Sequence, residues 1–207
     1  MNNYNPRLTI LQQIEYLSKY RSIQKKLKPL CEWVDFRDYI WSYNSIDWKD
    51  KIVLDIGADI GSSALYFLIN GAYKVFLLES DLMYQKIYKN IASVDFPALK
   101  YSTCQILENP KNLNAKSLKL CDEVDTLNSF VRSEYFDVLK MDCEGCELQL
   151  LTEDLIKRSR EFVVGLHKPQ LDDYQFEQKK SLLEKYGGKY YGSVNNEEFV
   201  WIKRLAK

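Results

Sequence analysis

The stretch that decides the fold is Lys51 to Ser63, KIVLDIGADIGSS. In it an apolar run, Ile52 to Leu54, ends at Asp55, and a turn with Gly57 and Gly61 follows. This order is typical of a buried strand that leads through a glycine-rich turn into a helix. The glycines allow a ligand to lie against the backbone, and the start of the helix offers unpaired N–H groups and the positive end of its dipole. We therefore predict that a polar ligand binds at this turn.

The composition is that of one globular domain. A chain of 207 residues with 46% hydrophobic and 28% charged residues can bury a single core, which excludes a disordered protein. Its 29 Lys and Arg residues balance 29 Asp and Glu residues, so no overall basic field favours nucleic acid. The beginning of the chain lacks the features of a secretory signal, and no apolar stretch reaches the ~18 residues of a membrane span. We predict a cytoplasmic protein without membrane contact.

The cysteines are an odd set in a chain that we expect not to be secreted, which predicts reduced thiols. The five are Cys31, Cys104, Cys121, Cys143 and Cys146. The spacing Cys143-x-x-Cys146 leaves two alternatives, a zinc site or a dithiol that oxidises. The other candidate zinc ligands are scattered along the chain, and this disfavours zinc.

The N-terminal part, residues 1–48, is predicted to be a helical and aromatic cap region. Apolar residues between Arg7 and Lys28 follow a helical period, and Pro29 ends that helix. The aromatic residues between Leu30 and Asp50 predict a packing layer, with a lid that walls a ligand site as the alternative. Residues 49–207 are predicted to form one compact domain.

Strands and helices alternate along this domain, which predicts an α/β fold with a mostly parallel sheet and helices on both faces. We expect strands over Lys74–Leu78, Ala98–Leu107, Leu120–Val124, Phe136–Met141 and Glu161–Leu166, and helices over Ser62–Asn70, Leu82–Ala92, Glu147 onward and Asp172–Tyr186. The last strands, 189–194 and 199–203, predict an antiparallel hairpin.

Four polar residues follow four of the predicted strands. They are Asp55, Glu79, Asp142 and His167. In open α/β sheets, ligands bind outside the carboxyl ends of the strands. The sequence therefore predicts that these four side chains converge on one crevice.

The motifs resemble those of a known enzyme family. An acid at the end of the first strand, then Gly-x-x-x-Gly and an acid after the second strand, is similar to the first motifs of class I S-adenosylmethionine-dependent methyltransferases, with their Rossmann-like sheet. The segment Leu139–Glu147, LKMDCEGCE, resembles the K-x-D-x-E-G-x-E motif of the FkbM-type methyltransferases in particular. The resemblance spans roughly Lys51 to Lys168. Two positions depart from it: Asp59 replaces the usual Asn, and Gly165 stands where the family often has the Glu of Glu-x-His.

The resemblance implies S-adenosylmethionine as the cofactor. Six residues would bind it: Asp55, Gly57, Ala58, Asp59, Gly61 and Glu79. The small residues would let its methionine end lie on the backbone, Asp55 would orient the turn or reach the ammonium, and Glu79 would accept hydrogen bonds from the ribose. A glycine turn of this kind can also bind a dinucleotide, but these acids attract a sulfonium ion and repel the pyrophosphate of a dinucleotide.

Three residues are predicted to be catalytic. His167 is the general base for a hydroxyl acceptor, with a structural histidine bonded to a loop carbonyl as the alternative. Asp142 and Glu144 bind the acceptor, hold the cofactor or assist the base, with helix capping as the alternative, and Glu147 is expected to cap the helix that follows. A divalent ion on these acids is compatible with the chemistry. Nothing in the spacing demands one, so no metal is predicted.

We expect O-methylation of a hydroxyl on a sugar, a glycan or a small metabolite. The enzyme alternative is an RNA or other nucleic-acid methyltransferase, which the neutral charge disfavours. The chain also lacks the Asn/Asp-Pro-Pro-Tyr/Phe segment of base amino methylases, and Asp142–Gly145 occupies its place. The remaining alternative is a non-catalytic partner protein with this fold, and a homo-oligomer stays open.

Overall fold

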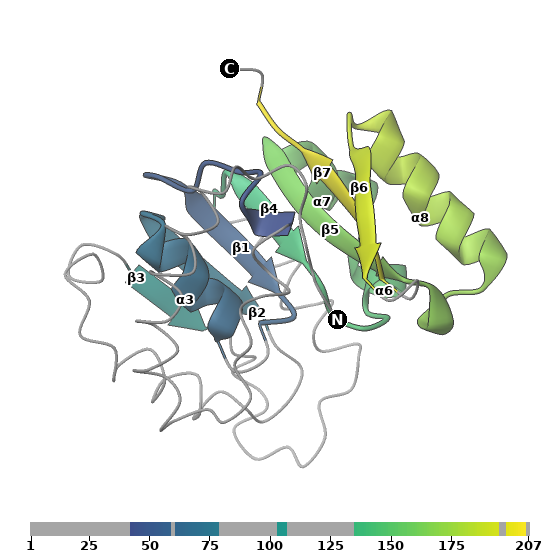
Figure 1. Cartoon of the computed structure of the whole chain (residues 1–207), viewed down its shortest axis with the longest axis horizontal. Coiled ribbons are helices and arrows are strands. Elements are labelled where there is room, and N and C mark those ends of the chain that lie inside the picture. The colour runs from purple at the N-terminus through teal and green to yellow at the C-terminus, as the bar shows by residue number, and fades with distance from the viewer. Residues whose placement is uncertain (1–41, 59–60, 79–102, 107–134, 195–197, 206–207) are drawn as a thin grey trace, which may run out of the picture.

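A seven-stranded sheet organises the molecule. The computed structural model describes residues 42–58, 61–78, 103–106, 135–194 and 198–205, which are coloured in Figure 1. The strands are β1 (Ile52–Ile56), β2 (Lys74–Leu78), β3 (Thr103–Ile106), β4 (Val138–Met141), β5 (Glu161–His167), β6 (Lys189–Val194) and β7 (Glu198–Lys203). Their order across the sheet is β3-β2-β1-β4-β5-β7-β6.

The first five strands in chain order are parallel, and the last two form the predicted hairpin. β1 pairs in parallel with both β2 and β4, so the carboxyl ends of these strands lie at one edge. β7 pairs antiparallel with β5 and with β6. The predicted α/β class, the mostly parallel sheet and the antiparallel C-terminal hairpin are thereby confirmed.

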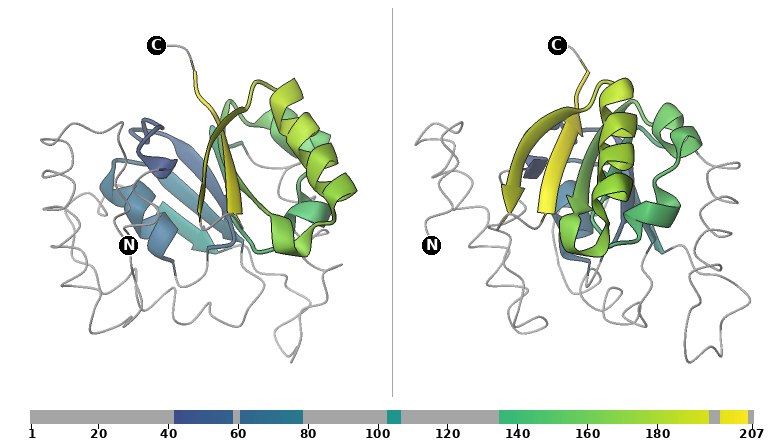
Figure 2. Two further views of the ribbon diagram at one scale, coloured as in Figure 1. Left: turned by 45° about the vertical axis from the view of Figure 1, so that its right-hand side comes forward. Right: turned by 90° about the vertical axis from the view of Figure 1, so that its right-hand side faces the viewer.

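Helices cover both faces of the sheet. They are α3 (Ser62–Ile69), α6 (Glu147–Leu150), α7 (Glu153–Arg158), the 3₁₀ turn η2 (Lys168–Gln170) and α8 (Asp173–Lys185). Successive residues of a strand point to opposite faces. Leu54 and Ile56 of β1 join the core that α6, α7 and α8 contribute to, whereas Asp55 points to α3, where it accepts a hydrogen bond from Ser63. Figure 2 shows α3 and α8 on opposite sides of the sheet.

The helix ends follow local sequence signals. After α3, Gly71 takes a left-handed conformation with a φ of 93°, as predicted for the residue that ends this helix. Asp172 and Gln175 form a reciprocal capping box at the start of α8. The helical pattern from Glu147 onward is divided into α6 and α7, because the Thr152 side chain caps a new helix by accepting from the Leu155 amide.

Two residues of the aromatic stretch are core residues. Trp48 stacks on Phe67 of α3, with ring centroids 4.2 Å apart, and Tyr43 contacts the same ring at 5.2 Å. Both residues are buried, so the packing interpretation is confirmed for Tyr43 and Trp48. Residues 1–41 of the predicted cap region lie outside the described residues.

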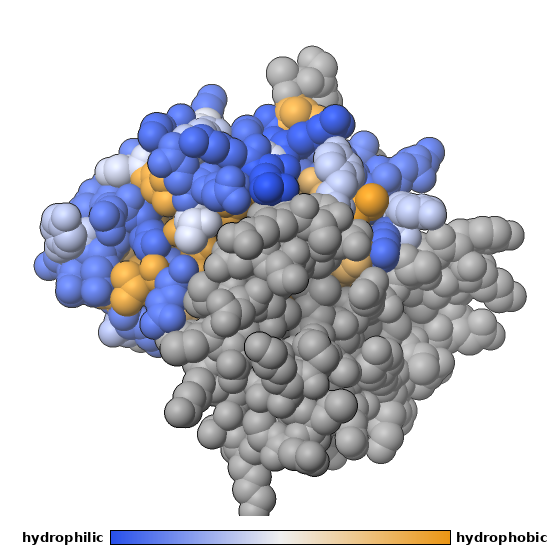
Figure 3. All heavy atoms as spheres, turned by 180° about the vertical axis from the view of Figure 1, so that it is seen from behind, coloured by the Kyte–Doolittle hydropathy of each residue, from blue (hydrophilic) through white to orange (hydrophobic). Residues whose placement is uncertain are grey.

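The remaining predicted strands and helices can be compared with the structure only in part. Within the third predicted strand, Ala98–Leu107, the structure describes Thr103–Ile106 as a strand, and the rest of that range lies outside the described residues. The predicted helix over Leu82–Ala92 and the edge strand over Leu120–Val124 lie outside the described residues. Where the structure is described, no helix is both long and apolar enough to span a bilayer. Seen from behind, the described surface is mainly hydrophilic, with small separate apolar patches (Figure 3).

Candidate functional site

The glycine turn after β1 lies directly against the loop after β4. Gly57 has a φ of 77°, and its N–H donates to the Leu78 carbonyl at 2.9 Å. A Cβ atom at this position would overlap the carbonyl of Asp142 and lie 2.8 Å from the Cβ of Cys143. Only glycine therefore permits this contact, which brings the two sequence motifs together.

The turn continues into α3 through a second glycine. Gly61 has a φ of 88° and precedes the first residue of the helix. Its N–H donates to the carbonyl of Ala58 at 2.8 Å, and Ala58 is buried. The predicted strand, glycine turn and helix are thus present. Asp59, between these residues, lies outside the described residues.

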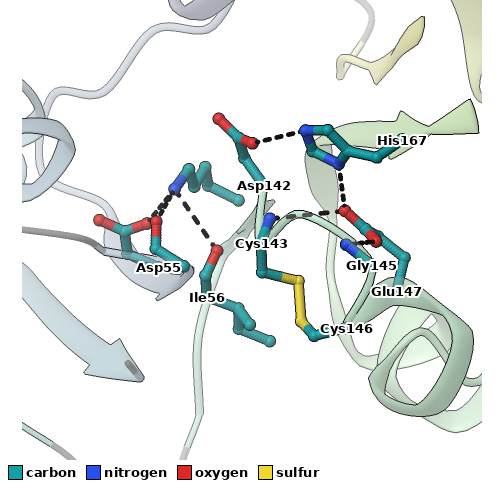
Figure 4. A network of polar contacts seen from close by, with 10 residues as sticks. Asp55, Ile56, Asp142, Cys143, Gly145, Cys146, Glu147 and His167 are labelled. Atoms are coloured by element: carbon teal, nitrogen blue, oxygen red, sulfur yellow. Dashed lines mark hydrogen bonds and ion pairs between the residues drawn. A yellow bond between two sulfur atoms is a disulfide. The ribbon is translucent and has the colours of Figure 1, made fainter. Parts of the chain in front are cut away.

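A buried ion pair between two neighbouring strands contacts the backbone of the turn. Asp55 of β1 stands beside Lys140 of β4 in the sheet register, and their charged atoms are 2.9 Å apart. The Lys140 ammonium also donates to the carbonyls of Gly57, at 2.5 Å, and Ile56, at 3.4 Å. Ser63 donates to the second Asp55 oxygen at 2.5 Å. Figure 4 shows this network beside the loop that carries Asp142.

Asp55 is therefore linked to the turn through Lys140, which is compatible with one of its two predicted roles, that of orienting the turn. Its side chain is fully buried. Burial raises the pKa of the Asp55 carboxyl, and the Lys140 ammonium and the Ser63 hydroxyl oppose that rise. Lys140 lies in the Leu139–Glu147 motif, and no role was predicted for it from the sequence. The available signal was a lysine between apolar residues of a buried strand, since such a charge needs a partner.

His167 lies between two carboxylates at the ends of β4 and β5. Its Nδ1 is 2.6 Å from Oε1 of Glu147, and its Nε2 is 3.3 Å from Oδ1 of Asp142 (Figure 4). Glu147 is fully buried and accepts hydrogen bonds from the amides of Gly145, at 2.7 Å, and Cys143, at 3.4 Å. The expectation that Glu147 caps the helix that follows is wrong, because the start of α6 has no side-chain cap and Glu147 accepts from amides that precede the helix. Its carboxylate contacts the imidazole instead.

The carboxylates hold a proton on the imidazole. Burial lowers the pKa of His167, but the hydrogen bonds and charges of Asp142 and Glu147 outweigh burial and raise the pKa to about 10. Burial likewise raises the pKa of Asp142, and its hydrogen bond with His167 and the charges of Lys140 and His167 bring it below the usual range. At neutral pH the pair is an imidazolium and a carboxylate. The structural alternative for His167 expected a loop carbonyl as partner, and the partners are carboxylates.

Glu198 of β7 is a site residue that the sequence analysis missed. It is the register partner of His167 in β5. One ligand atom each from Asp142, His167 and Glu198 lies within 4.8 Å of the other two. Burial and the charge of Asp142 raise the pKa of Glu198 to about 7.

Gly165 makes room for this carboxylate. A Cβ atom at Gly165 would lie 2.5 Å from Oε1 of Glu198. Gly165 is the position where the FkbM-type motif often has glutamate, and here a carboxylate from β7 fills the space next to it. The available signal was a glycine inside a buried strand, which indicates a close approach by another group.

Of the other predicted site residues, Glu144 is not brought into this cluster. Glu144 is exposed on the turn after β4 with a φ of 51°, and among the described residues it makes no hydrogen bond or ion pair. Glu79 follows β2 directly and lies outside the described residues.

Cys143 and Cys146 form a disulfide across the same loop. The prediction of reduced thiols is wrong for this pair, because the turn through Glu144 and Gly145 places the two Cα atoms 5.5 Å apart, within the usual disulfide range. The alternative of an oxidised dithiol is the correct one, and the bonded sulfurs are not zinc thiolates.

Comparison with solved structures finds the same fold in methyltransferases. The chain is 12% identical to the O-methyltransferase from Bacillus cereus in complex with SAH, with a TM-score of 0.58 over 97% of this chain and 93% of that one. It is 14% identical to a putative O-methyltransferase from Klebsiella pneumoniae, with a TM-score of 0.57 over 93% of this chain and 98% of that one. At these identities the likeness establishes the Rossmann-like methyltransferase fold.

Comparison of sequences finds viral relatives. No family model matches the chain. "Uncharacterized protein 158B" of Sulfolobus islandicus rod-shaped virus 1 is 32% identical over 177 residues, which are 84% of this chain and 92% of that protein. "Uncharacterized protein 65" of Sulfolobus islandicus filamentous virus is 31% identical over 134 residues, 64% of this chain and 69% of that protein. The chain belongs to the same protein family as these two proteins of Sulfolobus viruses.

Proposed function

We propose that the protein is an S-adenosylmethionine-dependent methyltransferase that methylates a hydroxyl group. The observation that carries this proposal is the contact between the Gly57 turn and the Asp142 loop, with His167 beside them at the carboxyl ends of three adjacent strands. This is where open α/β sheets bind their ligands. The solved structures of similar fold support the proposal, since one of those proteins is an O-methyltransferase in complex with SAH.

The charges around the turn suit a sulfonium cofactor better than a dinucleotide. Asp142 and Glu198 lie at the edge of the site, and Lys140 is already engaged by Asp55 and the turn carbonyls. Carboxylates attract the sulfonium and ammonium groups of S-adenosylmethionine and repel a pyrophosphate. We assign the methionine end of the cofactor to Gly57, Ala58 and Gly61.

Asp59 and Glu79 complete the proposed cofactor site. Glu79 directly follows the last residue of β2, next to β1 in the sheet, and an acid at this position would accept hydrogen bonds from the ribose hydroxyls. Asp59 adds a negative charge to the turn. We also propose the FkbM-type subgroup, on the strength of the Lys140–Glu147 segment.

Transfer of the methyl group is an in-line displacement, so the enzyme mainly aligns the donor and the acceptor. A hydroxyl acceptor must also lose its proton. A protonated His167 cannot take that proton, so His167 acts as the base only in its neutral form. Asp142, whose carboxylate stays ionised, is assigned to the acceptor hydroxyl. We propose a sugar, a glycan or a small metabolite as the acceptor.

Calorimetry on the full chain tests the cofactor. We expect S-adenosylhomocysteine to bind in the micromolar range and NAD not to bind. Glu79→Ala should weaken S-adenosylhomocysteine binding at least 10-fold, while Glu184→Gln, at an exposed position of α8, should leave it unchanged. Tight NAD binding without thioether binding would refute the assignment, and binding of neither ligand would favour a non-catalytic partner protein.

Transfer of a labelled methyl group from S-adenosylmethionine tests the acceptor. The assay compares a panel of sugars, glycans and small hydroxyl metabolites with total RNA. We expect label on a hydroxyl compound and none on RNA. Label on RNA, with retention that weakens steeply with salt, would favour the nucleic-acid alternative.

A further inference from the structure

Three strand ends present one potential metal ligand each to a common point. They are Asp142 after β4, His167 at the end of β5 and Glu198 at the start of β7. Their ligand atoms all lie within 4.8 Å of one another, and Asp142 Oδ1 is 3.3 Å from His167 Nε2. Metal–oxygen and metal–nitrogen bonds are about 2.0–2.6 Å long, so two ligands of one ion lie about 3–5 Å apart. The spacing of these three atoms fits a single divalent ion.

The histidine is oriented for such a role by a buried second carboxylate. Glu147 holds Nδ1 at 2.6 Å, which leaves Nε2 to face Asp142. The Glu147 carboxylate is in turn fixed by the amides of Gly145 and Cys143. A ligating histidine usually donates its other ring N–H to a carboxylate in this way, and the partner sets the orientation of the ring. The site therefore contains a histidine whose ring is oriented by a buried carboxylate, together with two further carboxylates. This distinguishes it from a cluster of acidic residues on the surface.

The backbone also leaves space for the third ligand. Gly165 lies on the same face of β5 as His167, and a side chain there would displace the Glu198 carboxylate, whose Oε1 is 2.5 Å from the position of a Cβ atom. Glu198 thus approaches the histidine across the strand pair. Its charge adds to that of Asp142, and a cation between the two carboxylates would relieve their repulsion.

We propose that Asp142, His167 and Glu198 bind one divalent metal ion through one imidazole nitrogen and two carboxylate oxygens, and that the proton on Nε2 of His167 is released to solvent as the ion binds. The set combines oxygen ligands, which suit Mn²⁺ and Mg²⁺, with an imidazole, which Mn²⁺ also accepts. No metal was predicted from the sequence, because nothing in the spacing of the acids demanded one, and Glu198 was not among the predicted site residues. The proposal is independent of the proposed methyltransferase function, since binding is measured without cofactor or acceptor. If both hold, the ion would polarise the acceptor hydroxyl, and His167 would serve as its ligand in place of the role of base.

The test is titration of the chelator-treated full chain with Mn²⁺, followed by the electron paramagnetic resonance signal of free Mn²⁺ and by calorimetry. We expect one Mn²⁺ per chain. Glu198→Gln and His167→Gln should each weaken binding at least 10-fold. Glu147→Gln keeps all three ligands but should also weaken binding, by about 10- to 100-fold, because it releases the ring.

A second pair of variants distinguishes the effect of the position of the Glu198 carboxylate from the effect of overall charge. Gly165→Ala retains every ligand and every charge and should still weaken binding at least 10-fold, since it displaces Glu198. Glu177→Gln, an exposed residue of α8, removes one negative charge away from the site and should bind like the wild type. Thermal unfolding checks that each variant is folded. If Gly165→Ala does not fold, the result with Glu198→Gln tests the proposal. No Mn²⁺ binding at 1 mM, or unchanged binding by folded Glu198→Gln, would overturn the proposal.

Discussion

Removal of the Lys140 ammonium should destabilise the protein far more than an ordinary lysine substitution. In Lys140→Met the Asp55 carboxylate loses a partner 2.9 Å away, and the carbonyl of Gly57 loses its donor. Both charged side chains are almost completely buried. Breaking a buried ion pair on one side costs about 3–5 kcal/mol, which is roughly a 6–20 °C drop in Tm for a chain of this size. Thermal and urea unfolding of the full chain measure the loss.

A double-mutant cycle identifies the cause. Asp55→Asn with Lys140→Met removes both charges and keeps a side-chain oxygen that can accept from Ser63. Most of the stability should therefore return, with a coupling energy of about 2–3 kcal/mol. The control is Lys179→Met, which removes an ammonium that donates to the Leu151 carbonyl at 2.8 Å and should cost about 1.5 kcal/mol.

The dependence of the loss on pH gives an independent check. Without the lysine, burial raises the pKa of Asp55 in the folded protein above its unfolded value. A carboxyl whose pKa is higher in the folded than in the unfolded protein stabilises the fold at low pH. This contribution is lost as the pH rises through the folded pKa. The difference in free energy of unfolding between wild type and Lys140→Met should therefore become smaller toward pH 4. A difference that does not depend on pH, or a double variant no more stable than Lys140→Met, would refute the ion-pair reasoning.

Three further perturbations test other parts of the structure. Gly57→Ala should cost about 2–5 kcal/mol and abolish cofactor binding, because its Cβ would overlap the loop after β4, and unfolding with calorimetry measures both effects. The serine variant of both Cys143 and Cys146 should lose about 2 kcal/mol, the chain-entropy value for so short a loop, whereas dithiothreitol should destabilise the wild type and leave this variant unchanged. Glu153 has a pKa lowered to about 2, first by its hydrogen bond from Tyr186, so its contribution is present above pH 4.5 and lost as the pH falls toward 2. The Tm difference between wild type and Glu153→Gln should therefore shrink over this interval, and a constant difference would contradict the assigned cause.

Strands and helices whose ends are marked by local residues were predicted from the sequence to within one or two residues. β1, α3, β2, β5 and α8 fall where apolar runs, Gly71 and the Asp172 cap indicate. What local patterns could not supply is the partner of each polar side chain. Asp55 and Lys140 meet because β1 and β4 are neighbours in register, and neither neighbourhood nor register is encoded within either strand.

The relation between Gly165 and Glu198 is a difference between this chain and the FkbM-type pattern. The FkbM-type pattern often has a glutamate two residues before the histidine of β5, and here that carboxylate is absent from β5 while one from β7 lies beside the same histidine. A Cβ atom at position 165 would be 2.5 Å from Glu198 Oε1, so any side chain there requires the Glu198 carboxylate to turn away. A relative with glutamate at position 165 should therefore carry a smaller or differently directed residue at position 198. Introducing Gly165→Glu together with Glu198→Ala should for the same reason restore Mn²⁺ binding that either change alone removes, and failure of this exchange would mean that the carboxylates are not equivalent.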